Sequence, residues 1–164
     1  MAASRPLVEP TSLTFVTNPD LSGVPQLREF KRYWDEKRGT RAMPVRADID
    51  PIELRAHLGW IYLIDVFPDL SDFRYRLLGS RITEAYGRDN TGKTVREIYE
   101  RDHADYCRAV LELYRTVARE AVPALGRGSL QIVQKPFRGY ETLYLPLDRG
   151  DGTVEMIVAK MEFR

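Results

Sequence analysis

The first clear alternation of hydrophobic and polar positions has the period of a helix and covers residues 27–38. Its apolar residues share helical spacing: Leu27, Phe30, Tyr33 and Trp34. Oppositely charged residues four positions apart occupy the other side, and a glycine follows at the natural end. The pattern predicts an amphipathic helix with an aromatic stripe. The stripe either packs on its own domain or forms an interface with a second copy of the chain.

Strand patterns flank a central helical region. The run Trp60–Val66 is almost wholly apolar, which is typical of a buried strand, and Phe73–Leu77 alternates as a half-exposed strand does. A turn-rich segment joins them, so we expect an antiparallel pair. Three further strands, joined by short turns with Pro, Gly and Asp, are predicted over Leu125–Gln134, Tyr140–Leu147 and Thr153–Phe163.

Helix signals occupy the region between the strands and one segment before them. Three predicted helices are short, and the fourth is the main helix of the core. They cover Pro51 to about His57, Ser80–Tyr86, the turn after a capping box formed by Thr94 and Glu97, and Asp102 to about Arg119. Strands at both ends with helices gathered between them indicate an α+β domain on one antiparallel sheet.

The first 25 residues carry four of the ten prolines and no apolar period. We therefore predict a flexible, Pro-rich arm over residues 1–25 and a single domain over residues 26–164. A chain of 164 residues is long enough for one such core.

Charge and composition narrow the classes of partner. With 25 Lys+Arg against 24 Asp+Glu, the net charge is +1, which argues against a broad nucleic-acid surface. The longest apolar run, Trp60–Ile64, is too short to cross a bilayer, and the amino end lacks a secretory signal pattern. We expect a soluble, cytoplasmic protein without membrane contact. A single cysteine, Cys107, excludes an internal disulfide and a Cys-rich zinc module.

The segment Gly87–Thr94 reads GRDNTGKT and satisfies the phosphate-binding pattern G-x-x-x-x-G-K-S/T. A phosphate-binding loop follows a buried parallel strand and opens a substantial helix. Here a predicted helix precedes it, and the helix after it is short. This context favours turn and helix-cap roles, and nucleotide binding remains a remote alternative.

Catalytic and metal-binding patterns are missing from the sequence. His57 and His103 are the only histidines, which is too few for a three-histidine metal site. His103 is four positions from Cys107 on the long helix, but a solvated histidine beside carboxylates is the simpler interpretation. No nucleophile has a base in a recognisable motif, and no pair of carboxylates stands out. We expect neither enzymatic activity nor a bound metal.

Several stretches together resemble a family of bacterial single-domain PAS proteins. They are MPVRADIDPIEL, WIYLIDV, FRYRLLGSRITEAYGRDNTGKT and ETLYLPL. The resemblance spans about Leu27 to Phe163 and is most specific over Phe73–Gly92. It implies an α+β, PAS-like fold, with a five-stranded antiparallel sheet in the order 2-1-5-4-3, helices on one face around a cavity, and an N-terminal flanking helix.

The resemblance also implies a function. We expect a non-catalytic sensory module that binds a small ligand between sheet and helices or docks a signalling protein, and that forms a homodimer. The alternative is a ligand-free interaction or dimerisation module. The cofactor is unidentified, a small metabolite being favoured over haem or flavin. The candidate cavity residues are Arg81, Tyr86, Tyr99, His103, Tyr106, Tyr114 and Tyr144. In the competing interpretation, Arg81 forms a structural salt bridge and the tyrosines fill the core.

Overall fold

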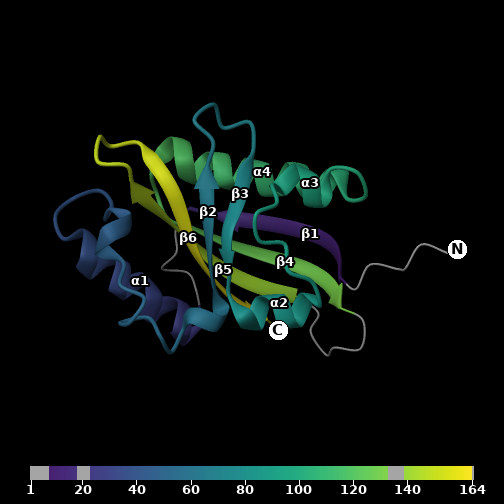
Figure 1. Cartoon of the computed structure of the whole chain (residues 1–164), viewed down its shortest axis with the longest axis horizontal. Coiled ribbons are helices and arrows are strands. Elements are labelled where there is room, and N and C mark those ends of the chain that lie inside the picture. The colour runs from purple at the N-terminus through teal and green to yellow at the C-terminus, as the bar shows by residue number, and fades with distance from the viewer. Residues whose placement is uncertain (1–7, 18–22, 133–138, 164) are drawn as a thin grey trace, which may run out of the picture.

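The computed structural model describes residues 8–17, 23–132 and 139–163, which build a six-stranded antiparallel sheet and four α-helices (Figure 1). The sheet order is β1-β4-β5-β6-β2-β3. The strands are β1 (Val8–Val16), β2 (Ile61–Val66), β3 (Phe73–Leu78), β4 (Ala124–Ile132), β5 (Gly139–Asp148) and β6 (Val154–Phe163). The helices are α1 (Pro25–Arg38), α2 (Ser80–Tyr86), α3 (Val95–Tyr99) and α4 (Ala104–Glu120).

Strands β2 to β6 have the expected topology, but the sheet has six strands and not five. The additional strand, β1, lies in the segment for which we predicted a flexible arm, so that prediction is wrong for residues 8–16. β1 pairs antiparallel with β4, with Val16 opposite Leu125. Its Leu13 and Phe15 pack against the core, and Pro10 sits at a register shift on the sheet edge, where a missing N–H is tolerated. The rest of the arm, apart from residues 8–17 and 23–25, lies outside the described residues.

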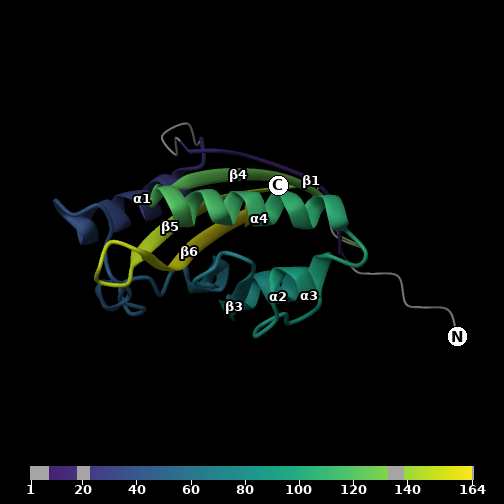
Figure 2. The ribbon, with the colours of Figure 1, turned by 90° about the horizontal axis from the view of Figure 1, so that it is seen from above.

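The helices around the candidate site begin and end where the sequence predicts. Gly87 ends α2 in the left-handed conformation, with φ of 69°, which a residue without Cβ adopts at little cost. Thr94 caps α3, because its hydroxyl accepts a hydrogen bond from the Glu97 N–H at 3.2 Å. The longest helix, α4, runs along the length of the sheet (Figure 2).

The short helix predicted from Pro51 to His57 is wrong. The segment is a series of turns that mixes hydrogen bonds of different spans, from Leu54 N–H to the Asp50 carbonyl and from His57 N–H to the Leu54 carbonyl. The Asp50 carboxylate accepts from the Ile52 N–H at 2.9 Å, as a cap would, but no regular helix follows. The Asp50 cap that could begin a helix is therefore present, but the residues after it do not form an apolar face long enough to stabilise one.

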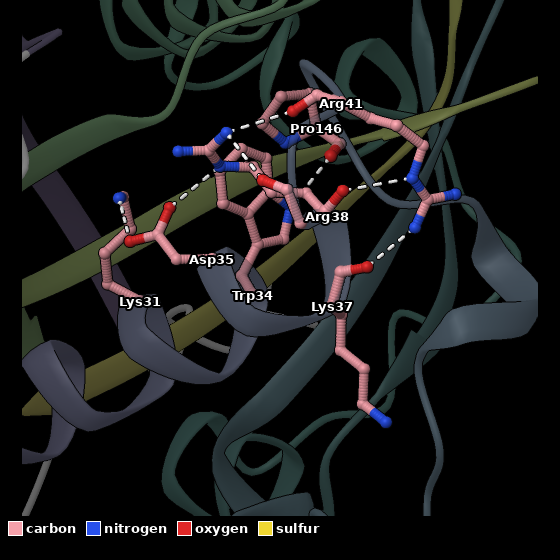
Figure 3. A network of polar contacts seen from close by, with 8 residues as sticks. Lys31, Trp34, Asp35, Lys37, Arg38, Arg41 and Pro146 are labelled. Atoms are coloured by element: carbon pink, nitrogen blue, oxygen red, sulfur yellow. Dashed lines mark hydrogen bonds and ion pairs between the residues drawn. The ribbon is translucent and has the colours of Figure 1, made fainter.

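Helix α1 packs on its own sheet, contacting β5 and β6 (Figure 1). Leu27, Phe30 and Trp34 are buried. The Trp34 indole N–H donates to the Pro146 carbonyl of β5 at 3.0 Å, within the polar network of Figure 3. Tyr33 is partly buried. Of the two alternatives for the aromatic stripe, packing within the chain is the one observed.

A buried charged group lies under α1. The Lys160 ammonium of β6 is 2.5 Å from His57 Nδ1 and 3.7 Å from a Glu162 oxygen. His57 Nε2 lies 3.7 Å from the Glu29 carboxylate on α1. Burial lowers the pKa of Lys160, and burial together with the nearby ammonium lowers the pKa of His57. A neutral His57 therefore accepts a hydrogen bond from Lys160 between α1 and the sheet.

Candidate ligand-binding cavity

Tyrosines concentrate around one cavity between the sheet and helices α2, α3 and α4. Eight of the nine tyrosines in the chain line it. They are Tyr62, Tyr75, Tyr86, Tyr99, Tyr106, Tyr114, Tyr140 and Tyr144. The cavity is therefore an aromatic space with hydroxyl groups directed into the protein interior.

Strand and helix periodicity place these rings on one side. Tyr140 and Tyr144 lie four residues apart on β5 and therefore share a face of the sheet. Tyr106 and Tyr114 are eight positions apart on α4, about two helical turns, and face the sheet together. Tyr62 on β2 lies against the Tyr144 ring, with centroids 6.3 Å apart in an edge-to-face arrangement.

The buried hydroxyls partner one another across the cavity. The Tyr75 and Tyr114 hydroxyls are 2.9 Å apart, which joins β3 to α4. The Tyr106 hydroxyl likewise pairs with that of Tyr140, which joins α4 to β5. These pairs satisfy polar atoms that would otherwise be costly to bury.

Partly exposed residues form the mouth of the cavity. Tyr86 at the end of α2, Arg88 and Asn90 in the following loop, and Tyr99 at the end of α3 all line it and all reach solvent. No described residue forms a hydrogen bond with the hydroxyl of Tyr86 or Tyr99. Groups that can bind a ligand are thus available at the entrance, whereas those deeper inside are paired.

The enclosed space is small. Its volume is about 40 Å³, measured as the space open to the centre of a water molecule. One water needs roughly 10–15 Å³ by this measure, so the interior has room for a few waters. A larger ligand would have to occupy the mouth or displace side chains there.

Burial keeps the phenols neutral. It raises the pKa of Tyr144 to about 12 and the pKa of Tyr62, Tyr75 and Tyr106 well above the ordinary value of 10. Repulsion between neighbouring phenolates adds to the effect for Tyr62 and Tyr106. At physiological pH the cavity is therefore lined by uncharged hydroxyls that can both donate and accept hydrogen bonds.

Comparison with family models gives a match to the PAS domain over residues 23–161. The chain belongs to the PAS domain family. The match runs from α1 to β6, without the last two residues of β6, and leaves out β1; the cavity lies within it. A comparison with curated protein sequences gives no significant match.

Five of the candidate residues line the cavity of this PAS domain, namely Tyr86, Tyr99, Tyr106, Tyr114 and Tyr144. Arg81 and His103 do not. Arg81 is exposed on α2, 3.6 Å from the Glu84 carboxylate, because the inward face of this helix is formed by Ile82 and its apolar neighbours. The structural salt bridge is thus the interpretation that the geometry supports.

His103 also lies away from the cavity lining, at the position that precedes α4. It is partly buried, and its backbone N–H donates to the Tyr99 carbonyl at 2.8 Å, while its own carbonyl accepts from Cys107. Its backbone therefore joins α3 to the start of α4.

Several lining residues were not among those predicted. Tyr62, Tyr75 and Tyr140 belong to strands, where alternation could have placed them on the same face once the sheet order was known. Arg88 and Asn90 belong to the loop that resembles a phosphate-binding motif, and the sequence of this loop gives no sign that the two side chains lie at the cavity mouth.

The loop Gly87–Thr94 is arranged as a set of turns in this PAS domain. The Gly92 N–H donates to the Tyr75 carbonyl at 2.7 Å, and the Lys93 N–H donates to the Asn90 carbonyl at 3.0 Å. The Thr91 N–H donates to the Asp89 carboxylate at 2.9 Å. These three donors are therefore engaged within the protein and do not converge on an empty phosphate-sized nest.

Over the part of the chain that the structure describes, no group of three or more His, Cys, Asp or Glu side chains could hold a metal ion. Within the same ranges, no helix combines the length and apolar character needed to cross a bilayer. Cys107 is buried, and its burial raises the pKa of the thiol, so the geometry provides no activated thiolate.

Proposed function

We propose that this PAS domain is a non-catalytic sensory module that binds a small molecule in the tyrosine-lined cavity. The observation that carries the proposal is the cavity itself, with eight aromatic hydroxyl side chains around one interior space and an opening beside α2 and α3. Concave sites of aromatic and apolar side chains with a few polar groups are the usual form of a ligand site.

The signal would leave through protein contact. Helix α2, the loop after it and helix α3 supply the partly exposed residues of the mouth, so a ligand there would alter the surface that these elements present. A signalling protein or a second copy of the domain would read this change. We place the module in the cytoplasm.

One observation favours the alternative of a ligand-free interaction module. The enclosed space is only about 40 Å³, and the paired tyrosine hydroxyls resemble a completed core. In that case the surface of the domain, and not an occupant of the cavity, would carry its function.

Native mass spectrometry and thermal unfolding against a metabolite panel distinguish the two functions. A sensor gives a bound mass or a raised melting temperature. Ile98→Trp, at the mouth, should abolish either effect, whereas Glu97→Trp, on the exposed side of the same helix, should preserve it. An unshifted mass with no stabilisation by any compound would refute the sensor and favour the interaction module.

A further inference from the structure

The charge of the cavity lining is one-sided. Among the described residues that line the cavity, Arg88 has the single charged side chain, and none is an Asp or a Glu. Moreover, no described residue forms a hydrogen bond or ion pair with the Arg88 guanidinium. A cation at the mouth of an otherwise neutral cavity favours an anionic ligand.

The free polar groups beside Arg88 can act as donors. The hydroxyls of Tyr86 and Tyr99 have no hydrogen-bond partner among the described residues, in contrast to those of Tyr75 and Tyr106, which are paired. Because burial keeps both mouth phenols protonated, they can donate to an anion without repelling it. Two neutral donors and one guanidinium at a single entrance suit an oxyanion.

The walls around these donors favour a flat aromatic body. The Tyr99 ring meets the Tyr106 ring edge-to-face with centroids 5.0 Å apart, and Tyr86 lies 6.0 Å from the Phe163 ring. Ile82 and Ile98 supply apolar surface on either side. The small enclosed volume limits the ligand to about one ring, seated at the mouth with modest movement of side chains.

We propose that the ligand of this cavity is a small aromatic carboxylate, whose ring lies among the tyrosine rings and whose carboxylate is bound by Arg88 with help from the Tyr86 and Tyr99 hydroxyls. The planar guanidinium fork matches a carboxylate in a way that a neutral amide does not. This inference rests on the proposed function and specifies the chemical class of its ligand.

Benzoate and its neutral analogue benzamide test the inference by calorimetric titration of the whole chain. We expect benzoate to bind the wild type at least about tenfold more tightly than benzamide does, because a charge-assisted hydrogen bond contributes that much. Arg88→Gln should weaken benzoate binding by a similar factor, with little effect on benzamide. Arg101→Gln, at an exposed position outside the cavity lining, is the matched control and should bind benzoate as the wild type does.

Other outcomes separate this inference from the proposed function. Equal binding of benzoate and benzamide, or unchanged benzoate binding by Arg88→Gln, would overturn the carboxylate inference and leave a sensor of neutral ligands. No binding of benzoate, with binding of another panel compound that Ile98→Trp abolishes, would also overturn it while supporting the sensor. If no compound binds at all, both proposals fall.

Discussion

Alkaline pH should unfold this domain cooperatively, and the buried tyrosines should determine how steeply unfolding depends on pH. Six of them, Tyr62, Tyr75, Tyr106, Tyr114, Tyr140 and Tyr144, are at most 8% exposed. Burial raises the pKa of each above its ordinary value of 10. Their phenols therefore remain protonated in the folded state after those of the unfolded chain have begun to ionise.

Proton linkage gives the sign and the size of the change in the free energy of unfolding with pH. Because the pKa of a buried tyrosine is higher in the folded than in the unfolded state, the stability it contributes is fully present below pH 10. This stability is lost as the pH rises from 10 toward the folded pKa. One pH unit above the ordinary pKa, each buried tyrosine lowers the free energy of unfolding by about 1.4 kcal/mol. Six together remove on the order of 8 kcal/mol, which is comparable to the whole stability of a typical domain.

Tyrosinate absorbance and far-ultraviolet circular dichroism, followed through the same alkaline titration, measure this effect. We expect most of the absorbance to appear in one steep step that coincides with the loss of secondary structure. Tyr86 and Tyr99 are partly exposed, but burial raises the pKa of their phenols as well, so we expect them to ionise in the same step. If six or more tyrosines ionised near pH 10 while the dichroism of the folded state persisted, the rings would not be shielded as described and the reasoning would be refuted.

Three further perturbations test other parts of the structure. Trp34→Ala should lower the free energy of unfolding by about 3–5 kcal/mol in urea, and a loss below about 1 kcal/mol would show that α1 does not dock on the sheet. Because the pKa of His57 is lowered on folding, the stability that the neutral imidazole contributes is present above the unfolded pKa of 6.5 and is lost as the pH falls. His57→Gln should therefore reduce the dependence of the free energy of unfolding on pH below 6.5. The same pH dependence in the variant and the wild type would contradict this. Gly128→Ala would place a methyl group 2.2 Å from the Tyr140 ring, which should lower the free energy of unfolding by about 1–3 kcal/mol and with it the melting temperature. An unchanged melting temperature would show that the Tyr140 ring does not lie against Gly128.

Much of the fold could be predicted from local patterns, because the relevant signals are short in range. The helix over Ser80–Tyr86 has its glycine stop, and the Thr94 cap forms as its spacing indicates. Strand β1 could not be predicted in this way, since its alternation is short and interrupted by Pro10. Its partner β4 lies far along the chain, and only that pairing makes the segment a strand.

The candidate site was predictable only in part for a related reason. Tyr106 and Tyr114 stand out because a single helix sets their common face. Tyr62 and Tyr140 lie on strands that are not adjacent, and their convergence depends on β6 lying between β2 and β5. In α2 the next residue, Ile82, faces the cavity, and the rotation of one helical position turns the Arg81 side chain to solvent.

The pairing of β1 with β4 bears on the order in which the chain folds. The register partners Val16 and Leu125 come from opposite ends of the sequence, so closing this contact carries a large loss of chain entropy until the intervening elements are in place. A segment that leaves the ribosome early must therefore wait for one of the last strands. We expect β1 to gain protection from hydrogen exchange after β5 and β6 during refolding, and protection of β1 before these strands would exclude this order.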